Sequence, residues 1–276
     1  MERQPPISPS SSGLHSVDQS VDPAARMQFL GTEGAKPAMQ LAKQRSFDLL
    51  AVRPDGRYLD VGCGTGDDAC TLAGMVGAGG SVTGIDFDPL MVAEAEKRAA
   101  GRNLTVEFRS ANVYDLPFAD ASYDGARADR TFLHLADPAG AIAQIYRVLA
   151  PGSRLVVQDR DIGTRTIDAA DRDLTRRITN FWCDSFLGGW TGRQLPRLFE
   201  QAGLVDTTIE SVTVIDRDYA AFNAQYDLHR VVQRAAEAAA ITADEGAAWL
   251  DEVETQARAG YFFSSVTSFI ICGRKP

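Results

Sequence analysis

Apolar and polar positions follow two periods along the chain, and the order of the two predicts an α/β fold. Short alternating or apolar runs bounded by turn residues predict strands, and apolar positions with helical spacing predict helices. The predicted strands cover residues 58–61, 81–87, 104–108, 123–128, 153–159, 207–215 and 262–272. The predicted helices cover residues 69–76, 88–100, 139–149, 174–186, 191–202, 219–239 and 244–259. Strands that alternate with helices in this way are typical of a parallel sheet covered by helices.

The two ends of this pattern suggest how the chain is organised. Residues 1–20 are rich in serine and proline and hold too few apolar side chains to order, so we expect a flexible tail. Residues 21–52 have a helical pattern that precedes the first strand, and residues 53–276 hold the alternating strands and helices. Within this last part, residues 160–190 and 216–260 interrupt the simple alternation, and we expect them to form helical additions beside a substrate pocket.

Composition excludes several classes of function. The 276 residues, 45% of them hydrophobic, suffice for one sizeable domain. A formal charge of −9 provides no general attraction to a phosphate backbone, so we expect no nucleic-acid partner. No apolar run approaches the ~20 residues of a membrane span and no signal pattern opens the chain, which predicts a cytoplasmic protein without a membrane partner. The four cysteines form no C-x-x-C pair, so we expect reduced thiols and no metal site.

The strongest local signal is a glycine-rich stretch after the first strand. Gly62, Gly64 and Gly66 stand between an apolar run and a helical pattern, which predicts a strand, a tight loop and a helix. Glycine adopts φ > 0 and lets the backbone approach a ligand. Asp60 at the strand end and two aspartates at the helix start would repel a phosphate. They favour a ligand such as S-adenosylmethionine, which carries an ammonium, a sulfonium and no phosphate.

A second ligand class satisfies the same loop. Residues 64–69 read Gly-Thr-Gly-Asp-Asp-Ala and match the fingerprint G-x-G-x-x-G/A of dinucleotide-binding folds. A nicotinamide- or flavin-dependent oxidoreductase is therefore an alternative, and a cofactor-binding titration separates the two interpretations.

Residues 59–66, Leu-Asp-Val-Gly-Cys-Gly-Thr-Gly, resemble the first motif of class I S-adenosylmethionine-dependent methyltransferases. Residues 129–138 resemble the fourth motif of small-molecule enzymes of the ubiquinone and menaquinone biosynthesis type. The resemblance implies a Rossmann-like, seven-stranded mixed sheet with helices on both faces, an antiparallel last strand, an N-terminal helical lid and a helical insertion. It implies S-adenosyl-L-methionine as cofactor and methyl transfer to an oxygen, nitrogen or carbon atom of a small organic molecule, a secondary metabolite among the candidates. A homo-oligomer is left open.

The resemblance also implies cofactor contacts at individual positions. They fall on Asp60, Gly62, Cys63, Gly64, Asp86, Phe87, Met91, Asn112, Val113, Arg130 and Arg45. Asp86 ends the second strand, where a carboxylate accepts hydrogen bonds from both ribose hydroxyls. Phe87 and Met91 would flank the adenine, with core packing as the alternative. Asn112 stands where the family more often has Asp, and Arg45 would offer a cation to the methionyl carboxylate or lie on a solvated helix face.

His134 and Asp129 are the candidate catalytic residues, because the fourth motif brings both to the carboxyl edge of the sheet. An imidazole with a pKa near neutrality is suited to accept a hydroxyl proton, and the alternative is that His134 only shapes the cofactor pocket. The aromatic candidates for the walls of a substrate pocket are Phe181, Trp182, Phe186 and Trp190. Since a fold does not fix a function, a protein that binds the same cofactor but catalyses another reaction, such as a cyclisation, is a further alternative.

Overall fold

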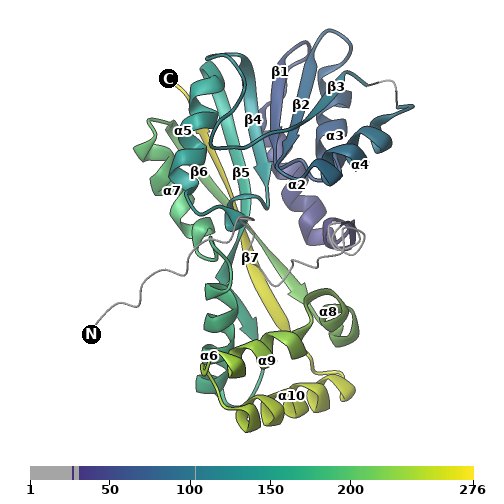
Figure 1. The fold of residues 1–276 in the computed structure, drawn as a ribbon, viewed down its shortest axis with the longest axis vertical. Coiled ribbons are helices and arrows are strands. Elements are labelled where there is room, and N and C mark those ends of the chain that lie inside the picture. The colour runs from purple at the N-terminus through teal and green to yellow at the C-terminus, as the bar shows by residue number, and fades with distance from the viewer. Residues whose placement is uncertain (1–26, 28–30, 103) are drawn as a thin grey trace.

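The computed structural model describes residues 27, 31–102 and 104–276, so the tail expected over residues 1–20 lies outside the described residues. The chain folds around a seven-stranded sheet with the order β3-β2-β1-β4-β5-β7-β6 (Figure 1). The strands are β1 (Arg57–Val61), β2 (Ser81–Asp86), β3 (Val106–Ser110), β4 (Tyr123–Asp129), β5 (Leu149–Ile167), β6 (Val205–Asp216) and β7 (Ser264–Arg274). The strands β1 to β5 pair in parallel, and β7 lies antiparallel between β5 and β6. The expected mixed sheet with an antiparallel last strand is confirmed.

The helices begin and end where local chemistry favours it. They are α2 (Pro37–Leu50), α3 (Asp67–Val76), α4 (Pro89–Ala99), the 3₁₀ helix η1 (Phe132–His134), α5 (Pro138–Val148), α6 (Arg172–Asp184), α7 (Thr191–Gln201), α8 (Tyr219–Tyr226), α9 (Leu228–Glu237) and α10 (Ala243–Arg258). Asp88 and Asp137 cap α4 and α5, each with proline at the first helical position. The single helix expected over 219–239 is divided at Asp227, whose φ of 48° ends α8.

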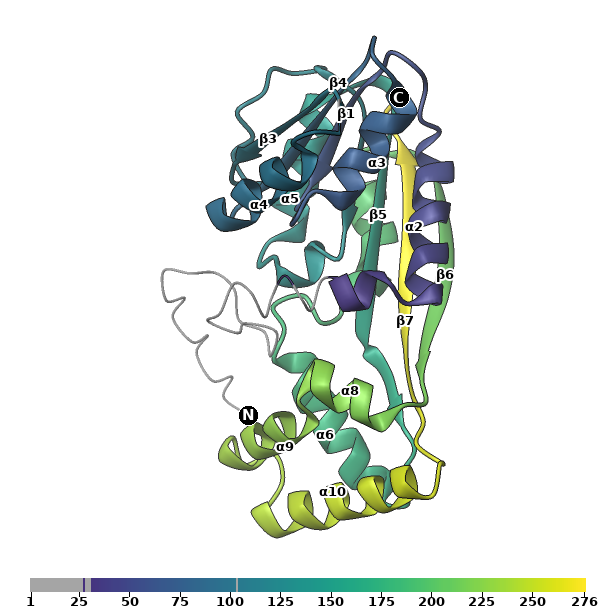
Figure 2. The same cartoon turned by 90° about the vertical axis from the view of Figure 1, so that its right-hand side faces the viewer.

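Strand alternation sends neighbouring side chains to opposite faces of the sheet. Tyr58 faces a core shared with α2, α3 and α4, whereas Leu59 and Val61 face a core shared with α5 and α7. Figure 2 shows α2 beside β6 and β7, and α2 packs against β4 to β7. The described part of the expected lid therefore belongs to a helical layer of the sheet.

Three strands continue past the carboxyl edge of the parallel sheet. β5 pairs with β4 only as far as Gln158, and its remaining residues run on beside β7 to Ile167. This extension carries α6, α8, α9 and α10, which form the lower lobe in Figure 1 with a hydrophobic core of their own. The range 160–190 thus begins as strand, where the sequence led us to expect a helical addition.

Candidate active site

The glycine loop has the backbone conformation that its sequence predicts. Gly62, Gly64 and Gly66 have φ values of 70°, 51° and 79°, a region that residues with a side chain adopt only rarely. A Cβ atom at position 62 would collide with the side chain of Thr131, which donates a hydrogen bond to the Val61 carbonyl oxygen at 3.1 Å. The loop after β4 is therefore in close contact with the loop after β1, and only glycine fits at position 62.

Asp86 joins this loop to the end of β2. Its Oδ2 atom accepts a hydrogen bond from the Gly64 amide at 2.9 Å, and its Oδ1 atom accepts one from the Asp88 amide at 2.9 Å. An ionised carboxylate accepts several hydrogen bonds at once. This geometry suits an acceptor of ribose hydroxyls, the role expected for Asp86.

A buried cluster of charges lies behind the loop, on the face covered by α2 and α3. Arg127 of β4 is fully buried, and its Nη1 atom lies 2.8 Å from Asp68 Oδ2 and 3.5 Å from Asp60 Oδ1. Lys43 of α2 lies 2.6 Å from Asp68 Oδ2 and 3.1 Å from Asp129 Oδ2. The cluster therefore holds three carboxylates and two cations, and Arg130, whose Nε atom lies 3.4 Å from Asp129 Oδ1, adds a third cation.

Asp60 is one of two carboxylates in the cluster with an oxygen atom that lacks a hydrogen-bond partner among the described residues, the other being Asp129. Burial raises the pKa of Asp60 to about 7, although the neighbouring Arg127 lowers it. Its Oδ2 atom has no hydrogen-bond partner among the described residues. A cationic group beside a buried carboxylate with an unbonded oxygen stabilises its ionised form. The site thus fits the ammonium group expected of the ligand.

The side chains expected around an adenine differ in exposure. Phe87 is 63% exposed and available to stack, whereas Met91 is only 2% exposed. Asn112 is exposed, and its Oδ1 atom accepts a hydrogen bond from the Tyr114 amide at 3.0 Å. Val113 and Cys63 are buried, and burial raises the pKa of the Cys63 thiol well above its usual range. The thiol is thus neutral, which leaves the backbone as the ligand-binding part of Cys63.

Two cations expected at the site lie in different surroundings. Arg45 projects from α2 to β6, where its Nη2 atom lies 2.7 Å from Glu210 Oε1. Lys43, one half-turn earlier, is the cation of α2 that reaches the buried cluster. Arg130 follows β4 with a φ of 54°, and its Nε atom lies 3.4 Å from Asp129 Oδ1. The structure therefore brings Arg130 to the cluster but not Arg45.

His134 ends η1 and packs near Phe186, with 6.4 Å between the ring centroids. Burial, with a smaller effect of Arg130, lowers the pKa of His134 to about 4. The near-neutral pKa expected from the sequence is therefore wrong, and the imidazole is neutral at physiological pH. The η1 backbone is fixed by Asp159, whose Oδ2 atom accepts a hydrogen bond from the Leu133 amide at 3.0 Å.

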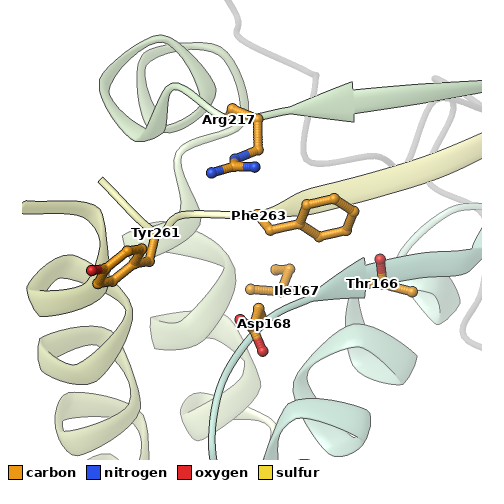
Figure 3. Close-up of a pocket in the computed structure, with 6 residues that line it drawn as sticks. All are labelled: Thr166, Ile167, Asp168, Arg217, Tyr261 and Phe263. Atoms are coloured by element: carbon orange, nitrogen blue, oxygen red, sulfur yellow. The ribbon is translucent and has the colours of Figure 1, made fainter. Parts of the chain in front are cut away.

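Two cavities lie along the extended strands. The larger, about 550 Å³, is lined by Thr166, Ile167, Asp168, Arg217, Tyr261 and Phe263 (Figure 3). Thr166 follows Gln158, the last β5 residue paired with β4, by eight positions. A register shift in β5 means that these positions pair with Ile270 and Ser265 of β7, five residues apart, so at about 3.3 Å per residue the cavity is roughly 17 Å from the edge that holds His134. A smaller cavity is lined by Leu133 beside His134 and by residues of β5, α6 and α8. Only this second cavity adjoins the candidate active site.

Comparison with known proteins decides the family. A family model described as a methyltransferase domain matches residues 53–203, more than half of the chain. The chain belongs to this methyltransferase family. S-adenosyl-L-methionine is the cofactor of such enzymes, which decides against the dinucleotide alternative. The glycine loop, Asp60 and Asp86 all lie inside the matched range.

Two relatives extend this result. The methyltransferase is 35% identical over 284 residues to an uncharacterized 37.1 kDa protein in transposon TN4556 of Streptomyces fradiae, across 98% of this chain and 81% of that protein. It is 41% identical over 115 residues to the demethylmenaquinone methyltransferase of Thermus thermophilus, across 42% of this chain. The second alignment spans only 52% of the Thermus enzyme. The chain thus matches about half the length of this relative of named activity.

A solved structure resembles the whole arrangement. The methyltransferase matches the [4+2]-cyclase SpnF with a TM-score of 0.57 and 26% identity, over 86% of this chain and 81% of that chain. None of the helices in the described residues has the length and apolar character to cross a bilayer. Within residues 27, 31–102 and 104–276, no group of three or more His, Cys, Asp or Glu side chains is arranged to hold a metal ion.

Proposed function

We propose that this methyltransferase transfers the sulfonium methyl group of S-adenosyl-L-methionine to an oxygen, nitrogen or carbon atom of a small organic molecule. The observation that carries the proposal is the buried carboxylate Asp60, with an unbonded Oδ2 atom behind a loop of three left-handed glycines. A cationic ligand without phosphate satisfies this arrangement, and a pyrophosphate does not. The cofactor supplies an electrophilic methyl group when it is bound.

The chain contributes chiefly by holding groups in place. Asp60 would bind the ammonium, Asp86 the ribose hydroxyls, and Phe87 would cover the adenine, while Arg130 and Lys43 would face the carboxylate. Positioning for an in-line displacement supplies up to ~7–11 kcal/mol of barrier reduction. His134 would stand at the acceptor side as a neutral imidazole. Because its pKa is about 4, it is a weak proton acceptor, which makes positioning the larger contribution.

The direct test has two stages. Calorimetry with S-adenosyl-L-methionine and S-adenosyl-L-homocysteine, with NAD and FAD as controls, checks the cofactor. A screen of phenols, amines and organic acids with methyl-labelled cofactor then checks transfer. Binding of the adenosyl compounds together with label in a small-molecule product supports the proposal. Binding of a dinucleotide in their place would contradict it.

The structural likeness to a [4+2]-cyclase favours a second candidate function, in which the bound cofactor is retained and the pocket promotes a cyclisation. Methyl transfer has the stronger support, because the matching family model describes a methyltransferase domain and the Thermus relative is a methyltransferase. Cofactor binding without methyl loss, together with conversion of an unsaturated substrate to an isomer of equal mass, would identify the cyclase. A cytoplasmic location fits the four free, buried cysteines, and a secondary metabolite as acceptor stays a prediction.

A further inference from the structure

The small cavity beside η1 lies between aromatic rings and two buried arginines. It is lined by Leu133, Arg160, Ile162, Arg165, Trp182, Phe186 and Tyr226. Both arginines come from the extension of β5 and are 5% and 6% exposed. The cavity measures about 20 Å³, which is room for a single water molecule. An acceptor can enter only if a side chain that now fills this region moves out.

Glu33 does not line the cavity but is hydrogen-bonded to two side chains that do, Arg160 and Tyr226. It is fully buried, and its carboxylate accepts hydrogen bonds from Arg160, from Gln225 and, at 2.8 Å, from the Tyr226 hydroxyl. Lys36 of the same segment lies 3.3 Å from Glu33 Oε2. Three side chains from the extended lobe thus already form a binding place for carboxylate oxygens, and a carboxylate from the start of the described chain fills it.

Arg165 is left without a matching anion. Its guanidinium lies over Trp182 and Tyr226, 4.3 and 4.9 Å from the ring centroids, and its Nη1 atom donates to Ser264 Oγ at 3.3 Å. Among the described residues Arg165 forms no ion pair with a carboxylate, and burial lowers its pKa, although the Tyr226 hydroxyl and Asp216 raise it to a smaller extent. Its Nε atom, like that of Arg160, lacks a hydrogen-bond partner in the described chain. A buried guanidinium without an ion-pair partner destabilises the folded protein unless a ligand supplies an anion and the missing hydrogen-bond acceptor.

The charges around the cavity do not balance. Lys36, Arg160 and Arg165 carry three positive charges, while Glu33 and Asp216 carry two negative charges, and Lys36 lies 2.7 Å from Asp216 Oδ1. With Glu33 in place the group carries one positive charge in excess, and with Glu33 displaced it carries two. A flat anion matches best, because aromatic rings prefer planar neighbours and guanidinium groups bind carboxylates through paired hydrogen bonds.

We propose that this cavity is the acceptor site and that the acceptor is a flat molecule with a carboxylate, which displaces Glu33 from Arg160 and pairs with Arg165. The inference rests on the proposed methyl transfer. Leu133 lines the cavity and His134 follows it in η1, so an acceptor held by Arg165 extends towards the methyl donor. Glu33 then serves as an internal substitute that keeps the site closed until the anion enters.

The test measures binding separately from chemistry. The enzyme saturated with S-adenosyl-L-homocysteine is titrated with benzoate, 4-hydroxycinnamate and 2-naphthoate, and with the neutral methyl ester of each, while tryptophan fluorescence reports on Trp182. The variants are Arg165→Gln and Glu33→Gln, with Arg176→Gln as the matched control, because Arg176 lies on the exposed face of α6. Thermal melts show which variants fold.

The expected pattern has opposite signs for the two variants. At least one acid binds more tightly than its ester, Arg165→Gln weakens that acid about 10–100-fold and leaves the ester unchanged, and Glu33→Gln tightens it. Arg176→Gln changes neither. Equal affinity for acid and ester in every pair overturns the proposal, as does a folded Arg165→Gln enzyme with parental affinity for the acids. If Arg165→Gln does not fold, unchanged acid affinity in Glu33→Gln overturns it.

Labelled methyl transfer is assayed on the same acids with the parent enzyme. Transfer to an acid that binds supports both the acceptor site and the proposed function. An acid that binds in the Arg165-dependent manner and is converted to an isomer, with no label transferred, contradicts methyl transfer but supports the anion site. The failure of one inference is thus distinguishable from the failure of the other.

Discussion

Asp60 and Arg127 occupy matched positions on the neighbouring parallel strands β1 and β4, and 3.5 Å separates Asp60 Oδ1 from Arg127 Nη1. Both side chains point to the face covered by α2 and α3, where the ring of Phe47 lies 4.5 Å from the guanidinium carbon. Asp68 and Asp129 surround the same guanidinium. The carboxylates outweigh the effect of burial and raise the pKa of Arg127, so the arginine stays charged at the centre of the fold.

Removal of this arginine is expected to destabilise the protein strongly. Arg127→Met removes the cation that lies between Asp60, Asp68 and Asp129, and Asp60 then loses its ion-pair partner. Breaking a buried pair from one side costs ~3–5 kcal/mol. Urea unfolding measures the change in the free energy of unfolding. Arg57→Gln is the control, because Arg57 pairs with Asp124 at an exposed position and should cost less than about 1 kcal/mol. Equal losses in the free energy of unfolding for Arg127→Met and Arg57→Gln would contradict the assignment of Arg127 to a buried ion pair.

Cofactor affinity is expected to rise with pH around neutrality. Because the pKa of Asp60 is about 7 in the free protein, the carboxyl group is mostly protonated at pH 6, and binding an ammonium requires its ionisation. Each pH unit below 7 should weaken S-adenosyl-L-homocysteine binding by up to about tenfold, and affinity should level off above 7.5. Calorimetry in matched buffers measures this. In Asp60→Asn, binding should lack this slope, with an affinity that is lower than the parental one above pH 7 and approaches it as the pH falls. A slope that persisted in the variant would assign it to another group.

The sheet was predictable from the sequence because most of its strands are apolar and bounded by turn residues. The extension of β5 was not. Asp159, Arg160 and Asp161 are buried charged residues within the strand, and their partners, among them Glu33 and Arg193, lie far along the chain. A run of charges before a glycine is typical of a turn. Tertiary pairing, which one sequence does not display, makes this segment a strand.

The candidate site was predictable where a backbone conformation requires a residue type. The three glycines were predictable because their left-handed φ values require glycine. Asp86 was predictable because it stands at the end of the strand β2. The choice between Lys43 and Arg45 depends on how α2 is rotated on the sheet, which packing sets. Arg127 carried one signal, a charge between two alanines in a central strand, and its meaning depends on register with Asp60.

Asp86→Ala is expected to weaken cofactor binding. The variant removes the charged acceptor proposed for the ribose and also the bonds to the Gly64 and Asp88 amides, a loss of ~1.5–3 kcal/mol for a hydrogen bond to an ionised group. Calorimetry with S-adenosyl-L-homocysteine measures the loss. Asp120→Ala serves as the control, since Asp120 is exposed and pairs with Arg147. Parental affinity in a folded Asp86→Ala protein would remove Asp86 from the ribose site.

Asp159 is expected to make the free protein less stable as the pH rises from about 4 to 7. Burial raises the pKa of Asp159 to about 7, against hydrogen bonds from the Arg160 and Leu133 amides that lower it. The folded state therefore binds a proton that the unfolded state releases, and stability falls by up to ~1.4 kcal/mol per pH unit. In Asp159→Asn, which cannot ionise at this position, the slope should be shallower than in the parent by up to ~1.4 kcal/mol per pH unit, and the remainder belongs to other groups such as Asp60. Urea unfolding at several pH values gives both curves, and parallel curves would contradict the prediction.

His134→Ala separates two kinds of acceptor. If the methyl group goes to a hydroxyl, a proton must leave, and loss of the imidazole should lower turnover by at least about 10²-fold, the lower end of the range for a general base. A pKa of about 4 predicts that turnover shows no His134-dependent step between pH 6 and 8. If the methyl group goes to an electron-rich carbon, the variant should lose much less. His229→Ala is the matched control, because His229 lies on α9 and contacts Glu254 at 2.8 Å. Cofactor affinity measured beside turnover shows whether His134 instead shapes the cofactor pocket, and parental values of both quantities would exclude it from either role.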